Sequence, residues 1–302
     1  MPSPLLLAAA RSERMRDLVT SVPLTRGVVD RFVAGNDLEA ALGAARKLGR
    51  EGLEVTLDHL GEHTREAAQA QATRDAYLRL FEAFAEHGLA AGADASVKLS
   101  ALGQALPGEL ALDLAQEICA AAGRAGMTVT LDMEDHTTVD STLEILGKLR
   151  GDFPWAGVAV QAMLRRSAGD LRDLARDGSR VRLVKGAYAE PPSVAFQSRH
   201  DVDRAYVRGL RLLMEGDGYP MVASHDPRII EIALALAAAR PPASYEFQML
   251  YGVRAAEQRR LAETDRMRVY VPYGADWYGY FMRRLAERPA NLVFFLRSFV
   301  SR

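Results

Sequence analysis

Residues 127–162 read MTVTLDMEDHTTVDSTLEILGKLRGDFPWAGVAVQA and contain a short β-prone run, a helical stretch and a second β-prone run. The first run is Met127–Asp132, which ends on a polar residue, and the second is Gly157–Ala162. Two short apolar strands that are separated by a helix are typical of parallel strands with a crossover connection. This stretch therefore predicts a parallel sheet that is covered by helices.

The same alternation continues along the chain from residue 53. Eight such runs occur, at Leu53–Asp58, Ala95–Ser100, Met127–Asp132, Gly157–Ala162, Val181–Gly186, Pro220–Ser224, Ser244–Gln248 and Met267–Tyr273. Eight strands with intervening helices fit closure into one (β/α)8 (TIM) barrel of roughly 250 residues. A doubly wound open sheet is the main competing fold, but no G-x-G-x-x-G fingerprint follows an early strand.

The chain before the first run is rich in alanine and leucine and contains helix signals but no strand. One such signal is Asn36-Asp37, which precedes Leu38-Glu39-Ala40-Ala41-Leu42. We therefore predict two parts, a helical extension over residues 1–51 and an α/β barrel over residues 52–302.

The composition limits the classes of function. The chain has 302 residues with 38 basic and 39 acidic side chains, a formal charge of −1, so it has no overall attraction for nucleic acid. One cysteine, Cys119, excludes an internal disulfide framework. The longest early apolar run, Leu5–Ala10, is too short for a membrane span and has no basic region before it. We expect a cytoplasmic protein.

The strand ends carry the candidate site, because the active site of a parallel barrel forms where the strands end. The polar and neighbouring residues there are Glu62, Lys98, Asp132, Met133, Gln161, Arg182, Lys185, Gly186, Ala187, Tyr188, Ser224, His225, Gln248, Met249, Leu250, Tyr270 and Tyr273. Such groups are costly to bury unless a ligand satisfies them. Any single one could equally be an ordinary polar residue that flanks a strand.

The segment from Asp276 to Pro289 gives a second signal. Asp276 is the predicted N-cap and Pro289 is expected to end the helix. One face of this helix would carry Tyr280, Arg283, Arg284 and Glu287. Two adjacent guanidinium groups beside an aromatic ring can receive a carboxylate. The spacing alone is more often that of a solvated charged face.

Two local patterns suggest other chemistry. His59-Leu-Gly-Glu62-His63 matches H-x-x-E-H, but Gly61 interrupts the continuous helix that a zinc site of this kind needs. Ser224-His225-Asp226 contains the residue types of a catalytic triad, but consecutive residues cannot align for it. We expect neither a metal site nor a serine hydrolase.

Several motifs together resemble the proline dehydrogenase family. They are Arg182-Leu-Val-Lys-Gly-Ala-Tyr188, Tyr245-Glu-Phe-Gln-Met-Leu250 and Tyr280-x-x-Arg283-Arg284-x-x-Glu287, supported by Leu60-Gly-Glu62, Val97-Lys98-Leu99, Leu131-Asp132-Met133-Glu134, Val160-Gln161 and Ser224-His225-Asp226. The match is ordered, spans nearly the whole chain and is closest to the short, monofunctional bacterial members. The resemblance implies a distorted barrel with the last helix over its mouth. It also implies noncovalent FAD, oxidation of L-proline to Δ1-pyrroline-5-carboxylate and electron transfer to a membrane quinone.

The resemblance also implies roles for single residues. The implied substrate site has Arg283, Arg284 and Lys98 around the carboxylate, Tyr270, Tyr280 and Leu250 around the ring, and Glu62 paired with Arg283 as a gate. The implied catalytic residues are Asp132, which orients basic groups rather than accepting a proton, and Arg182 near the flavin. The implied flavin contacts are Met133, Gln161, Arg182, Lys185, Gly186, Ala187, Tyr188, Ser224 and His225.

Some alternatives stay open at this point. Another flavin barrel, such as methylenetetrahydrofolate reductase, would not explain two adjacent arginines on the last helix. A helix-rich interaction scaffold is the rival from another class, given the alanine content. Leu5, Leu6 and Leu7 could support peripheral contact with a membrane, or they could simply pack against the barrel.

Overall fold

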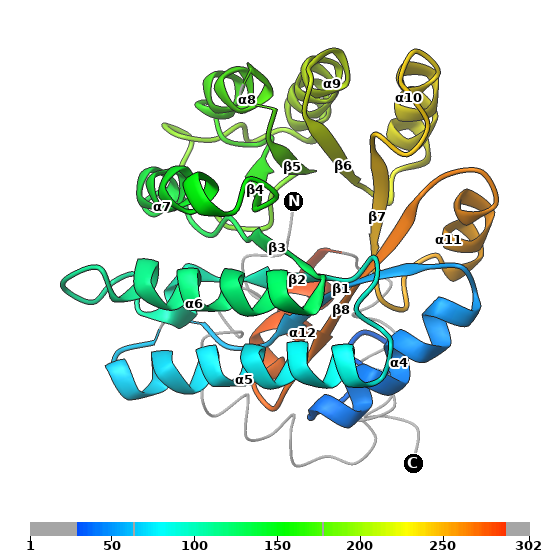
Figure 1. Ribbon diagram of the computed structural model, residues 1–302. Helices are drawn as coiled ribbons and strands as arrows, with labels where there is room; N and C mark the ends of the chain where they lie inside the picture. Colours follow the sequence, from blue (N-terminus) through cyan, green and yellow to red (C-terminus); the bar gives the residue numbers. More distant parts are fainter. Residues whose placement is uncertain (1–28, 63, 177, 288–302) are drawn as a thin grey trace, which may run out of the picture.

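The computed structural model describes residues 29–62, 64–176 and 178–287, and these form a closed barrel of eight parallel strands (Figure 1). The strands are β1 (Glu54–His59), β2 (Asp94–Val97), β3 (Thr128–Leu131), β4 (Gly157–Gln161), β5 (Arg180–Val184), β6 (Tyr219–Ala223), β7 (Glu246–Leu250) and β8 (Met267–Tyr273). Each strand pairs with the next in sequence, and β8 pairs with β1 over six residues. The predicted barrel is confirmed.

Seven of the predicted strands agree with the observed ones to within two residues at each end, but the second was predicted three residues too far. β2 ends at Val97, and Leu99–Leu102 forms the short 3-10 helix η1, so Ser100 is helical and Lys98 lies at the turn before η1. Leu99 and Leu102 are both buried and stand three residues apart, which is the repeat of a 3-10 helix. The burial of these two side chains explains why the chain leaves the strand here.

Seven helices follow the first seven strands and surround the barrel (Figure 1). They are α5 (Ala67–Glu86), α6 (Leu110–Ala125), α7 (Val139–Asp152), α8 (Ser167–Arg176), α9 (Arg199–Glu215), α10 (Pro227–Ala237) and α11 (Ala255–Ala262). The eighth place in the ring is filled by a helix that comes before the barrel strands. This helix, α4 (Leu38–Arg50), packs against β1 and β8 and lies between α5 and α11.

The sequence explains why α4 forms at this point. Asp37 caps it, because its carboxylate accepts a hydrogen bond from the backbone N–H of Ala40 at 2.9 Å. Its first turn carries Glu39, and its last turn carries Lys47 and Arg50, which suits the helix dipole. The predicted helix start at Asn36-Asp37 is thus confirmed. The division of the chain at residue 51 stays a prediction, since residues 1–28 lie outside the described residues.

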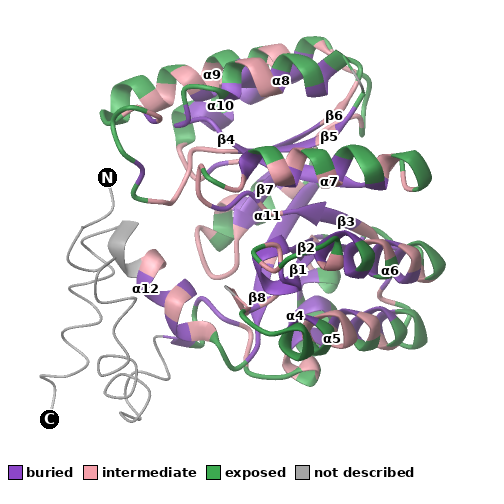
Figure 2. Ribbon diagram, turned by 90° about the vertical axis from the view of Figure 1, so that its left-hand side faces the viewer, coloured by how far each residue is buried: buried purple, intermediate pink, exposed green. Residues whose placement is uncertain are grey.

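The last helix, α12 (Trp277–Glu287), takes a different place from the others (Figure 2). It begins directly after Asp276 and lies at the end of the barrel, where Leu60 from the loop after β1 packs with Tyr280 and Phe281. The same small apolar cluster includes Val29, Phe32 and Val33. α12 therefore lies over the carboxyl ends of the strands rather than beside β8, as the resemblance implies.

The opposite end of the barrel contains a buried ionic network around Arg268 of β8. Its guanidinium contacts Glu246 of β7 at 2.7 and 2.9 Å and Glu54 of β1 at 2.5 Å. It also donates to the carbonyls of Val55 at 3.0 Å and Gly92 at 2.6 Å, so all five of its N–H groups are used. Burial alone would raise the pKa of Glu246, but Arg268 lowers that pKa to about 2. This network joins the first and last strands of the barrel.

Candidate active site

Asp132, which follows β3, is the centre of a polar network at the carboxyl ends of the strands. Its Oδ1 accepts a hydrogen bond from Arg182 of β5 at 2.7 Å, and its Oδ2 accepts one from the Tyr270 hydroxyl of β8 at 2.8 Å. The Lys98 Nζ lies 3.6 Å from the same Oδ2. The barrel thus brings together four predicted site residues that are far apart in the sequence.

The charges around Asp132 determine its protonation. Burial alone would raise the pKa of Asp132, but the nearby Lys98 and Arg182 outweigh burial and hold it below its ordinary value. Both carboxylate oxygens also have donors. Asp132 is therefore an ionised group that fixes its neighbours, which agrees with an orienting role.

Arg182 is held in place from several sides. Its Nη1 also donates to the Ser96 hydroxyl at 2.8 Å, and its Nη2 lies 3.4 Å from Asp94. The guanidinium lies over the Tyr270 ring at 5.3 Å from the centroid. Its Nε is buried and has no hydrogen-bond partner among the residues that the structure describes. Arg182 therefore has a fixed position, and its Nε–H donor is left for a ligand.

Two acidic residues of this network were missed from the sequence. Asp58 of β1 pairs with Lys98 at 2.5 Å, and Asp94 of β2 pairs with Arg182. Both carboxylates are completely buried. A signal was present for Asp58, because Thr56 and Asp58 alternate with apolar residues along β1, so their side chains share a face of the strand.

Asp94 is also the acceptor for a set of threonine hydroxyls. It accepts hydrogen bonds from Thr128 at 2.7 Å, from Thr130 at 3.1 Å and from Thr56 at 3.1 Å. These bonds tie β1, β2 and β3 together beneath Arg182. Asp94 therefore lies inside the barrel and links the threonines of these strands to Arg182.

α12 adds the second part of the site. Arg283 forms a two-pronged ion pair with Glu62 in the loop after β1, with one Nη1–Oε2 contact at 3.0 Å. The predicted pairing of these two residues is confirmed. The Arg284 guanidinium lies over the Tyr280 ring at 5.2 Å, and Tyr280 is buried. The two arginines therefore have different neighbours, one anionic and one aromatic.

A third group of predicted residues lies around the loop after β5. The Lys185 ammonium contacts Asp203 of α9 at 2.5 Å and Asp226, the N-cap of α10, at 3.2 Å. Gly186 has φ of +113°, and a Cβ there would lie 2.5 Å from the Met163 sulfur. Only glycine suits this position. Ala187 and Tyr188 follow in the same loop and are half-buried, and burial raises the pKa of Tyr188.

The remaining predicted residues make local contacts at the ends of β3, β4, β6 and β7. Gln161 donates its side-chain amide to the Glu134 carbonyl at 2.6 Å, next to the buried Met133. The His225 Nε2 accepts the backbone N–H of Leu250 at 2.9 Å, so the ends of β6 and β7 are joined.

Ser224 acts on its own loop, since its hydroxyl accepts the backbone N–H of Asp226 at 3.1 Å. In the described ranges, no group of three or more His, Cys, Asp or Glu side chains could hold a metal ion. His63 of the H-x-x-E-H pattern lies outside those ranges.

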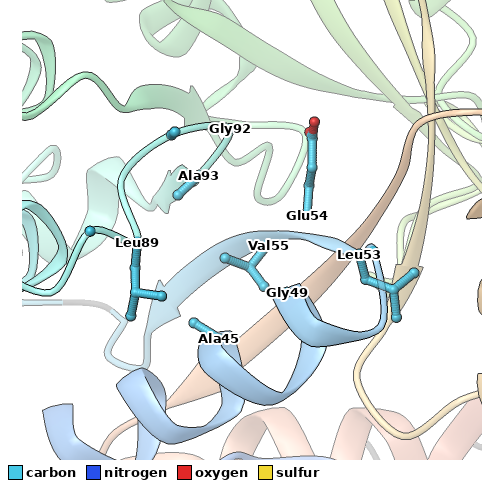
Figure 3. A pocket seen from close by; sticks show the side chains of 11 residues that line it. Ala45, Gly49, Leu53, Glu54, Val55, Leu89, Gly92 and Ala93 are labelled. Atoms are coloured by element: carbon cyan, nitrogen blue, oxygen red, sulfur yellow. The ribbon is translucent and has the colours of Figure 1, made fainter.

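A hollow of about 310 Å³ lies near the start of β1, between the end of α4 and the turn that leads into β2 (Figure 3). Its lining includes Glu54, Leu89 and Gly92, but none of the predicted site residues. It opens at the amino end of the barrel. The chemistry described above belongs to the other end.

Comparison with known proteins identifies the family. The sequence model of the family described as proline dehydrogenase matches residues 41–297. The chain belongs to the proline dehydrogenase family. It is 40% identical to proline dehydrogenase 1 of Bacillus subtilis over 281 residues, which cover 92% of both chains. It is 42% identical to the proline dehydrogenase of Deinococcus radiodurans over 275 residues, or 88% of both chains.

A solved structure agrees with this proline dehydrogenase assignment. The proline utilization A protein of Bdellovibrio bacteriovorus, inactivated by N-propargylglycine, superposes with a TM-score of 0.80 at 25% identity. The match covers 90% of this chain and 33% of that much longer one. Membership in the family supports an oxidoreductase function and leaves no reason for the scaffold and reductase alternatives.

Proposed function

We propose that this proline dehydrogenase family member oxidises L-proline to Δ1-pyrroline-5-carboxylate with bound FAD and passes the electrons to a quinone. This reaction would begin the degradation of proline to glutamate. The observation that carries the proposal is the cluster of Lys98, Arg182, Asp132 and Tyr270 at the strand ends. A set of basic groups held by carboxylates beside aromatic rings suits a small anionic amino acid.

The residues at the strand ends fit FAD. Arg182 has a buried Nε donor without a partner among the described residues. Gly186 has a backbone φ of +113° and a side chain there would collide with Met163, so the backbone of this loop carries no side chain at that point. The residues that would hold FAD are Met133, Gln161, Arg182, Lys185, Gly186, Ala187, Tyr188, Ser224 and His225. When bound, FAD would supply the acceptor for the hydride, which carries both of the electrons that leave proline. A fixed cation at Arg182 would stabilise negative charge on the reduced cofactor.

The chain's own residues would bind and orient proline. Arg283, Arg284 and Lys98 would hold its carboxylate, while Tyr270, Tyr280 and Leu250 would enclose its ring. Glu62 already pairs with Arg283, so this pair would act as a gate over the substrate. Holding the carboxylate fixes the orientation of the carbon that is oxidised, which lowers the entropic part of the barrier.

Asp132 would act through its neighbours. The ring nitrogen of proline must lose its proton before the adjacent C5 is oxidised. Asp132 is ionised and both of its oxygens have donors, so it is a poor acceptor for that proton. Its role would be to hold Arg182 and Tyr270 in place.

Arg182→Ala tests the cofactor assignment. We expect FAD to bind at least about tenfold more weakly, because the variant loses a charge-assisted donor beside the cofactor. The measurement is anaerobic titration of apoprotein with FAD, followed by flavin fluorescence. Arg176→Ala, on the exposed outer side of α8, is the matched control and should bind FAD normally. A wild-type apoprotein that binds no flavin would refute the cofactor assignment.

The quinone proposal includes peripheral contact with a membrane through Leu5, Leu6 and Leu7, which lie outside the described residues. No helix in the ranges that the structure describes is long and apolar enough to cross a membrane. We expect a chain without residues 1–28 to float less with lipid vesicles than the full chain does. This truncation keeps Val29, Phe32 and Val33, which pack with α12. Equal flotation of the two chains would count against membrane contact.

A further inference from the structure

Asp58 is a completely buried carboxylate near the carboxyl end of β1. Its Oδ1 lies 2.5 Å from the Lys98 ammonium. Its Oδ2 is also buried and has no hydrogen-bond partner within the described ranges. Burying a carboxylate with so few partners costs folding free energy, so we expect a function that explains Asp58 at this position.

The position of Lys98 depends on two carboxylates. Lys98 follows β2, which lies between β1 and β3. Asp58 belongs to β1 and Asp132 follows β3, and the contact of Lys98 with Asp132 is the longer one, at 3.6 Å. Burial alone would lower the pKa of Lys98, but Asp58 and Asp132 outweigh burial and raise it. Lys98 therefore stays charged although its side chain is almost inaccessible.

The geometry limits how else Lys98 could be held. Asp132 is already shared with Arg182 and Tyr270, which take one oxygen each. Among the described residues, the Asp58 carboxylate accepts a hydrogen bond from Lys98 only. The shorter and less shared contact fixes the ammonium best.

We propose that Asp58 is a positioning residue that fixes the Lys98 ammonium at the substrate carboxylate site. The inference rests on the proposed function, in which Lys98 binds the carboxylate of proline. Asp58 would not touch the substrate. Its influence would pass entirely through Lys98, and it would act on carboxylate ligands and leave ligands without a carboxylate unaffected.

A double-mutant cycle tests this inference in the flavin-loaded protein, with Asp58→Asn, Lys98→Met and the combined variant. The ligand is tetrahydrofuran-2-carboxylate, which keeps the ring and carboxylate, and pyrrolidine is the control without a carboxylate. Their dissociation constants are read from the change in flavin absorbance. Thermal unfolding and flavin content check that each variant is folded and loaded.

We expect Asp58→Asn to weaken tetrahydrofuran-2-carboxylate binding roughly tenfold or more, the effect of a lost charge-assisted contact. Pyrrolidine binding should change less than about twofold, and KM for L-proline should rise more than kcat falls. In the Lys98→Met background, Asp58→Asn should have almost no further effect on the carboxylate ligand. A general structural defect would instead weaken both ligands.

Two outcomes would overturn the inference. One is an unchanged affinity in Asp58→Asn, and the other is that the effects of Asp58→Asn and Lys98→Met simply add. If Lys98→Met alone leaves carboxylate binding unchanged, the proposed function of Lys98 fails, which is a separate result. Should Asp58→Asn not fold, Asp58→Glu replaces it, because the longer side chain displaces Lys98. A folded Asp58→Glu protein with normal carboxylate affinity would also refute the inference.

Discussion

Arg284→Met is expected to lower kcat/KM for L-proline by roughly ten- to over a hundredfold. Methionine keeps much of the side-chain length but would remove the proposed charge-assisted contact with the carboxylate, which is worth about 1.5 to 3 kcal/mol. Arg284 lies over the Tyr280 ring, so its guanidinium has a defined position on α12. Steady-state kinetics with L-proline measures the effect.

Tetrahydrofuran-2-carboxylate, as a ligand that carries the same carboxylate, should lose affinity to a similar degree in the Arg284→Met protein, whereas flavin content should not change. Arg266→Met is the matched control, since Arg266 is half-exposed at the start of β8, far from α12 along the barrel axis. It should keep normal kinetics. An Arg284→Met protein that retains FAD and oxidises L-proline at the wild-type rate would rule out α12 as the substrate anchor.

Glu246→Ala is expected to lower the free energy of unfolding by about 3 to 5 kcal/mol. The reason is that Arg268 would lose two of its close contacts and stay buried, and a buried charge without its partner is strongly destabilising. Urea denaturation followed by circular dichroism gives the midpoint and slope. The folded pKa of Glu246 lies below 4.5, so its contribution is complete above about pH 4.5 and is lost as pH falls toward 2.

Two controls separate the buried charge from general damage. The combined variant Glu246→Leu and Arg268→Met removes both charges and should be less destabilised than Glu246→Ala. Glu109→Ala removes one partner of an exposed ion pair with Lys148 and should have a much smaller effect. If Glu246→Ala unfolds at the same urea concentration as Glu109→Ala, the network does not stabilise the barrel.

Much of the fold could be predicted because each barrel strand is short, contains β-prone apolar residues and is followed by polar residues and a helical stretch. Met267–Tyr273 is a strand over its full predicted range. The ends of other strands differ from the predicted ones by a few residues, because the hydrophobic pattern does not stop where the strand does. Ser244 illustrates this, since it bonds back to the Pro241 carbonyl and β7 starts only at Glu246. Hydrogen bonds within the turn determine where such a strand begins, and the hydrophobic pattern of the sequence does not reveal these bonds.

The candidate site was predictable where residues stand at strand ends, as Lys98 and Asp132 do, and where a basic residue interrupts an apolar strand, as Arg182 does in β5. Asp58 and Asp94 were missed because an acid within a barrel strand normally argues against burial. Their partners, Lys98 and Arg182, come from other strands, and only the closed barrel brings them together. The place of α4 in the helix ring was also missed, because no local pattern specifies which helix fills the last position.

The seam between β1 and β8 has a consequence for folding during synthesis. Glu54 and Arg268, which pair across this seam, are 214 residues apart in the chain. At ribosomal rates of about 5 to 20 residues per second, β1 waits roughly 10 to 40 s for its second neighbour. During that time one edge of β1 and the apolar face of α4 lack the strand that will cover them. An unpaired strand edge can pair with other chains, so this interval is the period in which the nascent chain is most open to aggregation at β1.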